Sequence, residues 1–349
     1  MRRRRVLQAV SGALPLGLAG CTFFASEPDL SSVTTRPWQR EDAVYHPAHG
    51  KGMRVLETLQ HGDRTVGIFY TYVERFWTVT GRQIQRVEAQ EEYNAVHLMI
   101  SVWDTDTGTA LPVDSGLRIV VERDGQRVTE RAPWPMLSQQ MGFHFGDNVI
   151  FGDQATFTID VEVGTVTVDR LGEFEGKFDE SGVVSVEFDF LRGLRNEITV
   201  EKYSDRRGNA GARAPMEMEV LPLSVAPDAT ELPGRILGTA TSGDAVFIAA
   251  VSDSPDGQYL TVSPRTPYNE YVLPLMSLSA SVTRNGSTVF EGALPVAIDP
   301  ERGYHYGTRT DGIESGDELR ITVDAPPQVA RHEGYETAFL DMPPMVMTA

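Results

Sequence analysis

The residues best suited to chemistry are the histidines, and two of them repeat one local pattern. His144 and His305 each lie between two aromatic residues, with a glycine on either side of the triplet. The glycines predict a tight loop that aims the imidazole, although a histidine that hydrogen-bonds its own loop would explain each pattern equally well. His97 lies in a predicted strand, and Met136 precedes His144 by eight residues. A thioether with two imidazoles suits copper, and iron less well, whereas ordinary core filling is the alternative for Met136.

A second group of soft ligands comes early in the chain. His46 and His49 are three residues apart, and Met53 follows four residues later. These three side chains can wrap around one soft metal ion. A solvated loop ahead of a β-domain is the other interpretation, and His61, in Gln60–Asp63, is typical of a turn.

The N-terminus has the features of an export signal. Arg2–Arg5 are basic, Val10–Ala19 are mostly apolar, and Leu18-Ala19-Gly20-Cys21 ends the segment. The apolar run is shorter than the roughly 20 residues that a spanning helix needs, so we interpret 1–21 as a lipoprotein signal peptide. The arginines fit twin-arginine export. Lipidated Cys21 would anchor the protein to the outer face of the cytoplasmic membrane at the cell surface, and stable anchoring predicts two or more acyl chains.

Composition excludes several classes of function. Cys21 is the only cysteine, which excludes a disulfide framework, a cysteine zinc site and a catalytic thiol from the exported fold. The net charge is −18, with three lysines among 31 basic residues. This balance is typical of a halophilic surface, such as that of a salt-loving archaeon, and provides no basic patch for nucleic acid. The sequence also contains no Gly-x-Ser-x-Gly, P-loop or His-Glu-x-x-His motif, so we expect a protein that is not an enzyme.

Short β-rich runs must position these side chains. Gly, Asp, Asn and Pro separate the runs, several of which alternate between apolar and polar residues, and helical periodicity is scarce. The predicted strands are Thr65–Val73, Ala95–Trp103, Leu117–Glu122, Thr156–Val163, Val183–Phe190, Ala245–Val251, Met276–Thr283 and Leu319–Val323. We therefore predict an all-β fold of two tandem immunoglobulin-like β-sandwich domains.

An internal repeat defines the predicted domains. The segment 123–146 aligns with 284–307 without a gap, from Arg-Asp-Gly and Arg-Asn-Gly turns to the two aromatic–His–aromatic loops. Upstream, we align Ala95-Val96-His97 with Ala245-Val246-Phe247. The predicted organisation is a tether at 22–40, a first sandwich at 41–200, a linker at 201–219 and a second sandwich at 220–349.

These motifs resemble the bacterial periplasmic iron-transport accessory family. The resemblance rests on His97-Leu98, Asp124-Gly125, Pro135-Met136 and Gly142–Asn148, and, in the second half, on 326–332. It covers about 70 residues of each predicted domain and implies immunoglobulin-like sandwiches that bind copper or ferrous iron and assist iron uptake. It also implies that His97, Met136, His144, His305 and His332 match metal ligands.

The departures from that family pattern suggest a shared site. Met99 stands where the family has a carboxylate, and no histidine lies near Leu171 where the first domain should have a late one. In the second domain, Phe247 and Ala297 stand where the first has His97 and Met136. We therefore expect His332 to approach His97 and His144 to within about 8 Å, as in a homodimer site that is now shared between fused domains. Decay of one or both domains to a scaffold is the alternative.

The sequence thus predicts an extracytoplasmic metal-binding lipoprotein that handles copper or ferrous iron beside a membrane transporter. The alternative is a metal-free cell-surface scaffold or adhesion protein built from immunoglobulin-like domains. The sequence leaves the metal, the transporter and the oligomeric state open.

Overall fold

The computed structural model describes residues 43–349 except 90–93, 192–193, 204 and 256. The predicted signal peptide, Cys21 and the tether lie outside the described residues. The described residues all belong to one compact unit, and its division into a linker at 201–219 between two domains stays a prediction. The described residues include no helix with the length and apolar character that crossing a membrane requires.

The described chain is almost entirely β-structure, which confirms the predicted fold class. The strands up to residue 203 are β1 (His49–Lys51), β2 (Arg54–His61), β3 (Arg64–Thr71), β4 (Phe76–Thr80), β5 (Gln83–Val87), β6 (Ala95–Asp104), β7 (Arg118–Arg123), β8 (Gln126–Arg131), β9 (Trp134–Ser138), β10 (Gly142–Ile150), β11 (Ala155–Val163), β12 (Asp169–Arg170), β13 (Gly182–Phe190) and β14 (Val200–Lys202). The later strands are β15 (Arg235–Ser242), β16 (Ala245–Ser254), β17 (Gly257–Arg265), β18 (Ser277–Arg284), β19 (Ser287–Leu294), β20 (Val296–Asp299), β21 (Gly303–Thr310), β22 (Glu318–Ala325), β23 (Ala330–Arg331) and β24 (Met345–Thr348). Two short 3-10 helices, η1 (Gly172–Phe174) and η2 (Leu194–Glu197), interrupt them.

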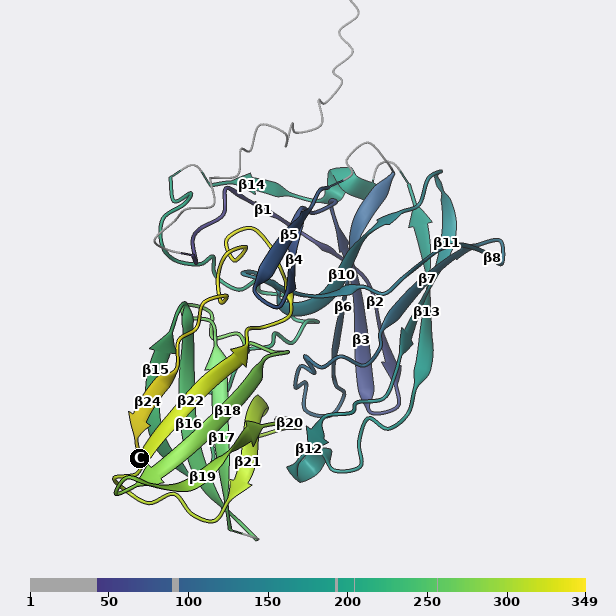
Figure 1. Ribbon diagram of the computed structural model, residues 1–349. Helices are drawn as coiled ribbons and strands as arrows, with labels where there is room; N and C mark the ends of the chain where they lie inside the picture. The colour runs from purple at the N-terminus through teal and green to yellow at the C-terminus, as the bar shows by residue number, and fades with distance from the viewer. Residues whose placement is uncertain (1–42, 90–93, 192–193, 204, 256) are drawn as a thin grey trace, which may run out of the picture. The chain divides into compact units, whose positions relative to one another are not determined.

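The strands form two pairs of sheets and one small ribbon (Figure 1). An eight-stranded sheet, in the order β2-β3-β6-β10-β9-β23-β4-β5, accompanies a four-stranded sheet, β13-β11-β7-β8. A six-stranded sheet, β12-β20-β21-β17-β16-β15, accompanies a second four-stranded sheet, β19-β18-β22-β24, and β1 pairs with β14. Leu98 and Ile100 of β6 share a buried core with Ile159 and Val161 of β11, so inward-facing residues of each sheet pack against the other.

The local sequence explains the hairpins. Asp124 and Gly125 both have positive φ, 51° and 73°, and join β7 to β8 in a two-residue loop. Asn285 and Gly286, with φ of 51° and 79°, do the same between β18 and β19. Asp-Gly and Asn-Gly favour this hairpin turn because it needs positive φ at both central residues.

The two sheet pairs repeat one topology. β2-β3-β6-β10-β9 has the same order as β15-β16-β17-β21-β20, and β13-β11-β7-β8 has the same order as β24-β22-β18-β19. The β4–β5 hairpin is an addition between β3 and β6. The gap-free repeat from residue 123 to 146 therefore corresponds to strands β7–β10, which match β18–β21.

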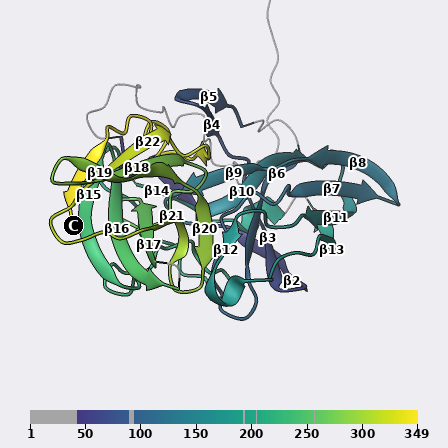
Figure 2. The same cartoon turned by 60° about the horizontal axis from the view of Figure 1, so that its bottom comes forward.

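Each half of the chain contributes a short strand to the other half's large sheet. β23 lies parallel to β9, with Ala330 opposite Met136, and its other neighbour is β4. β12 lies parallel to β20, with Asp169 opposite Ala297, and both views place these two strands side by side (Figures 1 and 2). This reciprocal exchange is the arrangement expected of two swapped subunits joined into one chain.

Candidate metal centre

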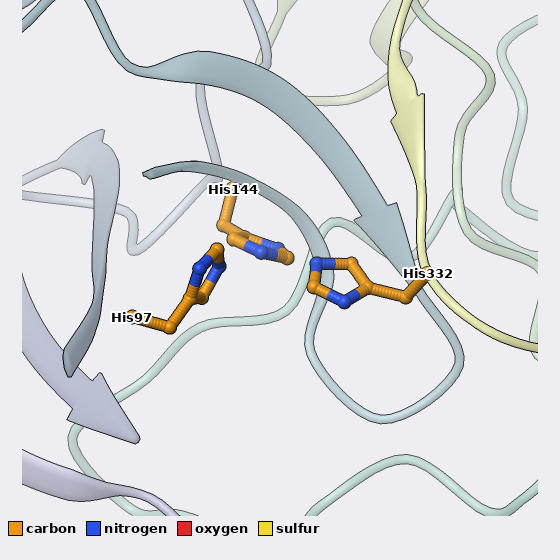
Figure 3. Close-up of side chains that lie close together, drawn as sticks. All are labelled: His97, His144 and His332. Carbon is orange, nitrogen blue, oxygen red and sulfur yellow. The ribbon is translucent and has the colours of Figure 1, made fainter. Parts of the chain in front are cut away.

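Three histidines from distant parts of the sequence converge on one point. His97 lies on β6, His144 on β10, and His332 follows β23 directly. The prediction of a tight loop around His144 and His305 was wrong, because both residues lie within strands. One ring nitrogen from each of the three converging histidines lies within 4.8 Å of those of the other two. The ring centroids are 6.5 Å apart for His97 and His144, 5.5 Å for His97 and His332, and 5.3 Å for His144 and His332. Figure 3 shows the three rings turned toward a common space. We call these residues the histidine triad.

Strand register explains why His97 and His144 share a face. Successive residues of a strand point to opposite faces, and Phe143 and Phe145 face the core on either side of His144. On β10, Asn148 is opposite His97 of β6, and His144 is opposite Met136 of β9. The two histidines and Met136 therefore occupy the face of the eight-stranded sheet that turns away from its four-stranded partner.

The exchanged strand delivers the third histidine. The backbone N–H of His332 donates to the carbonyl of Leu137 at 3.2 Å, which continues the pairing of β23 with β9. The buried Arg331 guanidinium donates to the carbonyls of Pro327 and Val329 at 3.0 and 2.6 Å. These bonds hold the segment from 327 to 332 in place, so the position of His332 follows from backbone pairing.

A glycine leaves room at the centre. A Cβ atom at Gly146 would lie 2.8 Å from His97 Nε2 and 3.1 Å from Met136 Sδ. The imidazole nitrogen and the thioether sulfur therefore border the same small space. The φ of Gly146 is not positive, so close approach of side chains, and not backbone conformation, requires glycine here.

Hydrogen bonds determine which nitrogen of His97 carries the proton. His97 Nδ1 lies 3.1 Å from Asn148 Oδ1. The Asn148 amide is oriented by Glu74, because its Oδ1 accepts from the Glu74 N–H and its Nδ2 donates to the Glu74 carbonyl. His97 Nδ1 must therefore be the donor, which leaves a lone pair on Nε2.

His144 has the same tautomer for a simpler reason. Its Nδ1 lies 3.2 Å from the carbonyl of Gly142, which can only accept. The Nε2 atoms of His97, His144 and His332 are all buried, and none has a hydrogen-bond partner among the described residues. Buried polar atoms are nearly always paired, so these three nitrogens together need an explanation.

Burial keeps the triad neutral. Loss of solvation lowers the pKa of His97 to about 3, and the neighbouring His144 adds to this effect. Burial lowers the pKa of His144 to about 4 and that of His332 well below its usual value. Three uncharged imidazoles at neutral pH are the state in which histidine binds metal.

Charged groups surround the triad without joining it. Lys51 Nζ lies 3.2 Å from Glu74 and donates to the carbonyl of Val73. Glu333 lies 3.5 Å from His49 Nδ1 and accepts from the backbone N–H of Ala48. Burial raises the pKa of both carboxyl groups. The donors that face the central space are therefore three nitrogens and the sulfur of Met136.

The structure separates the other predicted ligands from this group. His305 lies on β21 of the six-stranded sheet, with Nε2 3.2 Å from Tyr259 Oη. His46, His49 and Met53 have three different surroundings: His46 Nε2 lies against Gly211, His49 pairs with Glu333, and Met53 packs near Phe69. A second metal cluster formed by these three residues stays a prediction.

His305 occupies the position equivalent to the triad in the second half. The pairing of β17 with β21 places Tyr259 where β6 and β10 place His97. The expected counterpart, Phe247, lies instead on β16, which corresponds to β3. That alignment was wrong because the β4–β5 insertion separates β3 from β6. Ala297 is opposite His305, as Met136 is opposite His144, so that expected substitution is correct.

The late histidine also has a defined counterpart. The backbone N–H of Leu171 donates to the carbonyl of Ile298, as that of His332 does to Leu137. The equivalent site therefore consists of Tyr259, Ala297, His305 and Leu171. A cavity of about 960 Å³ opens beside it, lined by residues that include Tyr259 and Leu171.

Gly146 and Asn148 are site residues that were not assigned a role from the sequence. Both belong to the Gly142–Asn148 motif that carries the family resemblance. Alternation along a strand places them on the face of His144, but the sequence analysis predicted a loop here. Their contacts with His97 depend on the pairing of β6 with β10, which the local sequence does not reveal.

Comparison with known proteins adds one match. A family model described as a domain of unknown function (DUF7350) matches residues 230–348, which include β15–β24. A search of curated proteins found no match. The match covers about a third of the chain and excludes His97, Met136 and His144, so the chain is similar to this family over the second half alone.

Proposed function

We propose that this protein is an extracytoplasmic lipoprotein that binds copper or ferrous iron and assists its uptake by a membrane transporter. The observation that carries the proposal is the convergence of three histidine rings beside a thioether, each with a buried Nε2 that has no hydrogen-bond partner among the described residues. Leaving such buried polar atoms unsatisfied costs about 1–3 kcal/mol each. A cation bound by these atoms would remove this cost. Metal binding is therefore the simplest explanation of the arrangement.

The donor set favours copper over iron. Three neutral imidazoles and a thioether are soft to intermediate ligands, which suit copper best. The carboxylate of Glu333, the residue after His332, lies 3.5 Å from His49 Nδ1 and accepts from the backbone N–H of Ala48. Ferrous iron is the second candidate. It binds imidazole, but its sites usually include a carboxylate as well.

The proposed location depends on Cys21. Lipidation there would hold the site close to the outer face of the membrane, where a transporter could receive the ion. We expect Cys21→Ser to release the protein from the membrane fraction of cells. Full retention of the substituted protein by membranes would show that another feature anchors it.

The function itself is tested by a matched pair of substitutions. His144→Phe removes a triad ligand, whereas His305→Phe makes the same change at the equivalent position of β21. In a Cys21→Ser background, which removes the thiol, we expect the unsubstituted protein to retain one copper ion after aerobic loading with Cu²⁺, which imidazoles bind and thioethers alone do not select, and dialysis in high salt. His305→Phe should retain it and His144→Phe should lose it, as measured by elemental analysis. A metal-free scaffold would retain neither copper nor iron in any of the three proteins.

A further inference from the structure

Five methionines gather next to the histidine triad. We call them the methionine cluster: Met53, Met99, Met141, Met216 and Met218. They pack with Phe69, Leu221 and Leu223 as a group separate from the main core. Thioether side chains thus make up most of this small cluster.

The cluster is continuous with the triad. Met99 lies two residues after His97 on β6, so both side chains project from the same face. Across the sheet, Met99 is opposite Gly146, the residue whose missing side chain leaves space for His97 Nε2 and Met136 Sδ. Met141 directly precedes Gly142, whose carbonyl accepts the hydrogen bond from His144.

The cluster also reaches solvent. Met99 and Met141 are 5% and 3% exposed, whereas Met53, Met216 and Met218 are only partly buried. Met216 is held over the sheet by a hydrogen bond from its N–H to the carbonyl of Gln140 at 2.9 Å. Thioethers are therefore present from the surface to the edge of the triad.

The second half of the chain distinguishes this arrangement from ordinary packing. Its methionines, Met276, Met342, Met345 and Met347, all belong to the main core. At the position equivalent to Met99, β17 has Thr261, and at that equivalent to Met141 the chain has Arg302. The half without a triad therefore lacks methionine at both buried cluster positions.

We infer that the methionine cluster is a second metal site, which binds monovalent copper (Cu⁺) through thioether sulfur and lies on the route by which copper reaches the triad. Thioethers select Cu⁺ among the common biological cations. Movement of Cu⁺ from sulfur to the imidazoles exchanges ligands only, so no electron or proton acceptor is needed. The inference rests on the proposed function, since it identifies the oxidation state and entry route of the same ion.

Stoichiometry of Cu⁺ binding tests the site. The full chain with Cys21→Ser is titrated anaerobically with Cu⁺ against a chromophoric chelator, and the expected result is two equivalents. Met99→Leu/Met141→Leu/Met218→Leu should bind one, because leucine preserves volume but not the sulfur donors. The control, Met345→Leu/Met347→Leu in the main core, should bind two.

A second variant changes only partly exposed methionines, so that its result does not depend on core packing. Met53→Leu/Met216→Leu changes two residues at the solvent-facing end of the cluster, and we expect it to slow loading of the triad from the chelator at least about tenfold. Unchanged stoichiometry in the triple variant, or an unchanged loading rate in the double variant, would overturn the inference.

Triad variants separate this inference from the proposed function. His97→Ala/His144→Ala should retain one equivalent, held by the methionine cluster. If that variant still binds two, the triad is not a metal site and the proposed function fails. If it binds none, all copper depends on the triad, and the methionine cluster is only a packing feature.

Discussion

The histidine triad and its equivalent in the second half share a backbone but differ in ligands. In both, an aromatic–His–aromatic triplet within a strand buries an imidazole whose Nδ1 faces the carbonyl two residues earlier, at 3.2 Å for His144 and 3.0 Å for His305. Burial lowers the pKa of both to about 4. The Nε2 of His144 is unpartnered among the described residues, whereas that of His305 meets Tyr259 Oη.

The aromatic–His–aromatic motif is therefore not sufficient to form a metal site. The difference lies at three other positions, where His97, Met136 and His332 are replaced by Tyr259, Ala297 and Leu171. Two of these positions belong to neighbouring strands and one to the strand exchanged between the halves. A donor set therefore depends on residues that the sheets bring together, and the following changes test that dependence.

Replacing His332 should have the largest effect. His332→Leu gives the triad the residue that its equivalent has at Leu171. We expect copper affinity to fall by more than 100-fold, because loss of a direct ligand should exceed the 10–100-fold effect of outer-shell changes. Competition with a chelator measures it. His305→Phe is the control, and equal affinities in the two variants would contradict the assignment.

Filling the central space should lower copper affinity nearly as much. In Gly146→Ala the new methyl group would lie 2.8 Å from His97 Nε2, and we expect copper affinity to fall about 100-fold, or roughly 2.7 kcal/mol. Gly307→Ala is the matched control, because its methyl would meet Tyr259 in the equivalent site. If both substitutions leave copper binding unchanged, the ion does not occupy the space beside Gly146.

Acid should destabilise the copper-free protein through His305. The pKa of His305 is about 4 when folded and about 6.5 when unfolded. Above pH 6.5 both states are neutral, but between pH 6.5 and 4 the unfolded chain binds the proton first, so stability falls as pH falls. We expect this residue to contribute roughly 3 kcal/mol over that range. Denaturant unfolding of His305→Phe should show a correspondingly shallower pH dependence, and an unchanged slope would refute the assignment.

The smallest effect should come from the residue that orients His97. Asn148→Ala removes the acceptor of the His97 Nδ1–H bond, and we expect about a tenfold loss of copper affinity, since outer-shell partners contribute on that scale. Arg309→Ala is the control at the equivalent, exposed position of β21. Equal affinities would mean that packing alone orients His97.

The sequence by itself determined the features that depend on neighbouring residues. Alternating side chains predicted strands that the structure contains, such as β11, β13 and β22, because the alternation is set by the geometry of a single strand. Asp124-Gly125 and Asn285-Gly286 predicted hairpins because the turn needs positive φ at two adjacent residues. The gap-free repeat also predicted that Ala297 replaces Met136.

Only the tertiary structure decided which strands are neighbours. The β4–β5 insertion makes Tyr259, and not Phe247, the counterpart of His97. The exchange of β12 and β23 brings His332 to residues almost 200 positions earlier in the chain. Pairings over such distances depend on the summed burial and hydrogen bonding of whole sheets, which no local pattern encodes. The residue types indicated which side chains could bind a metal, but their assembly into one site depends on the exchange of β23.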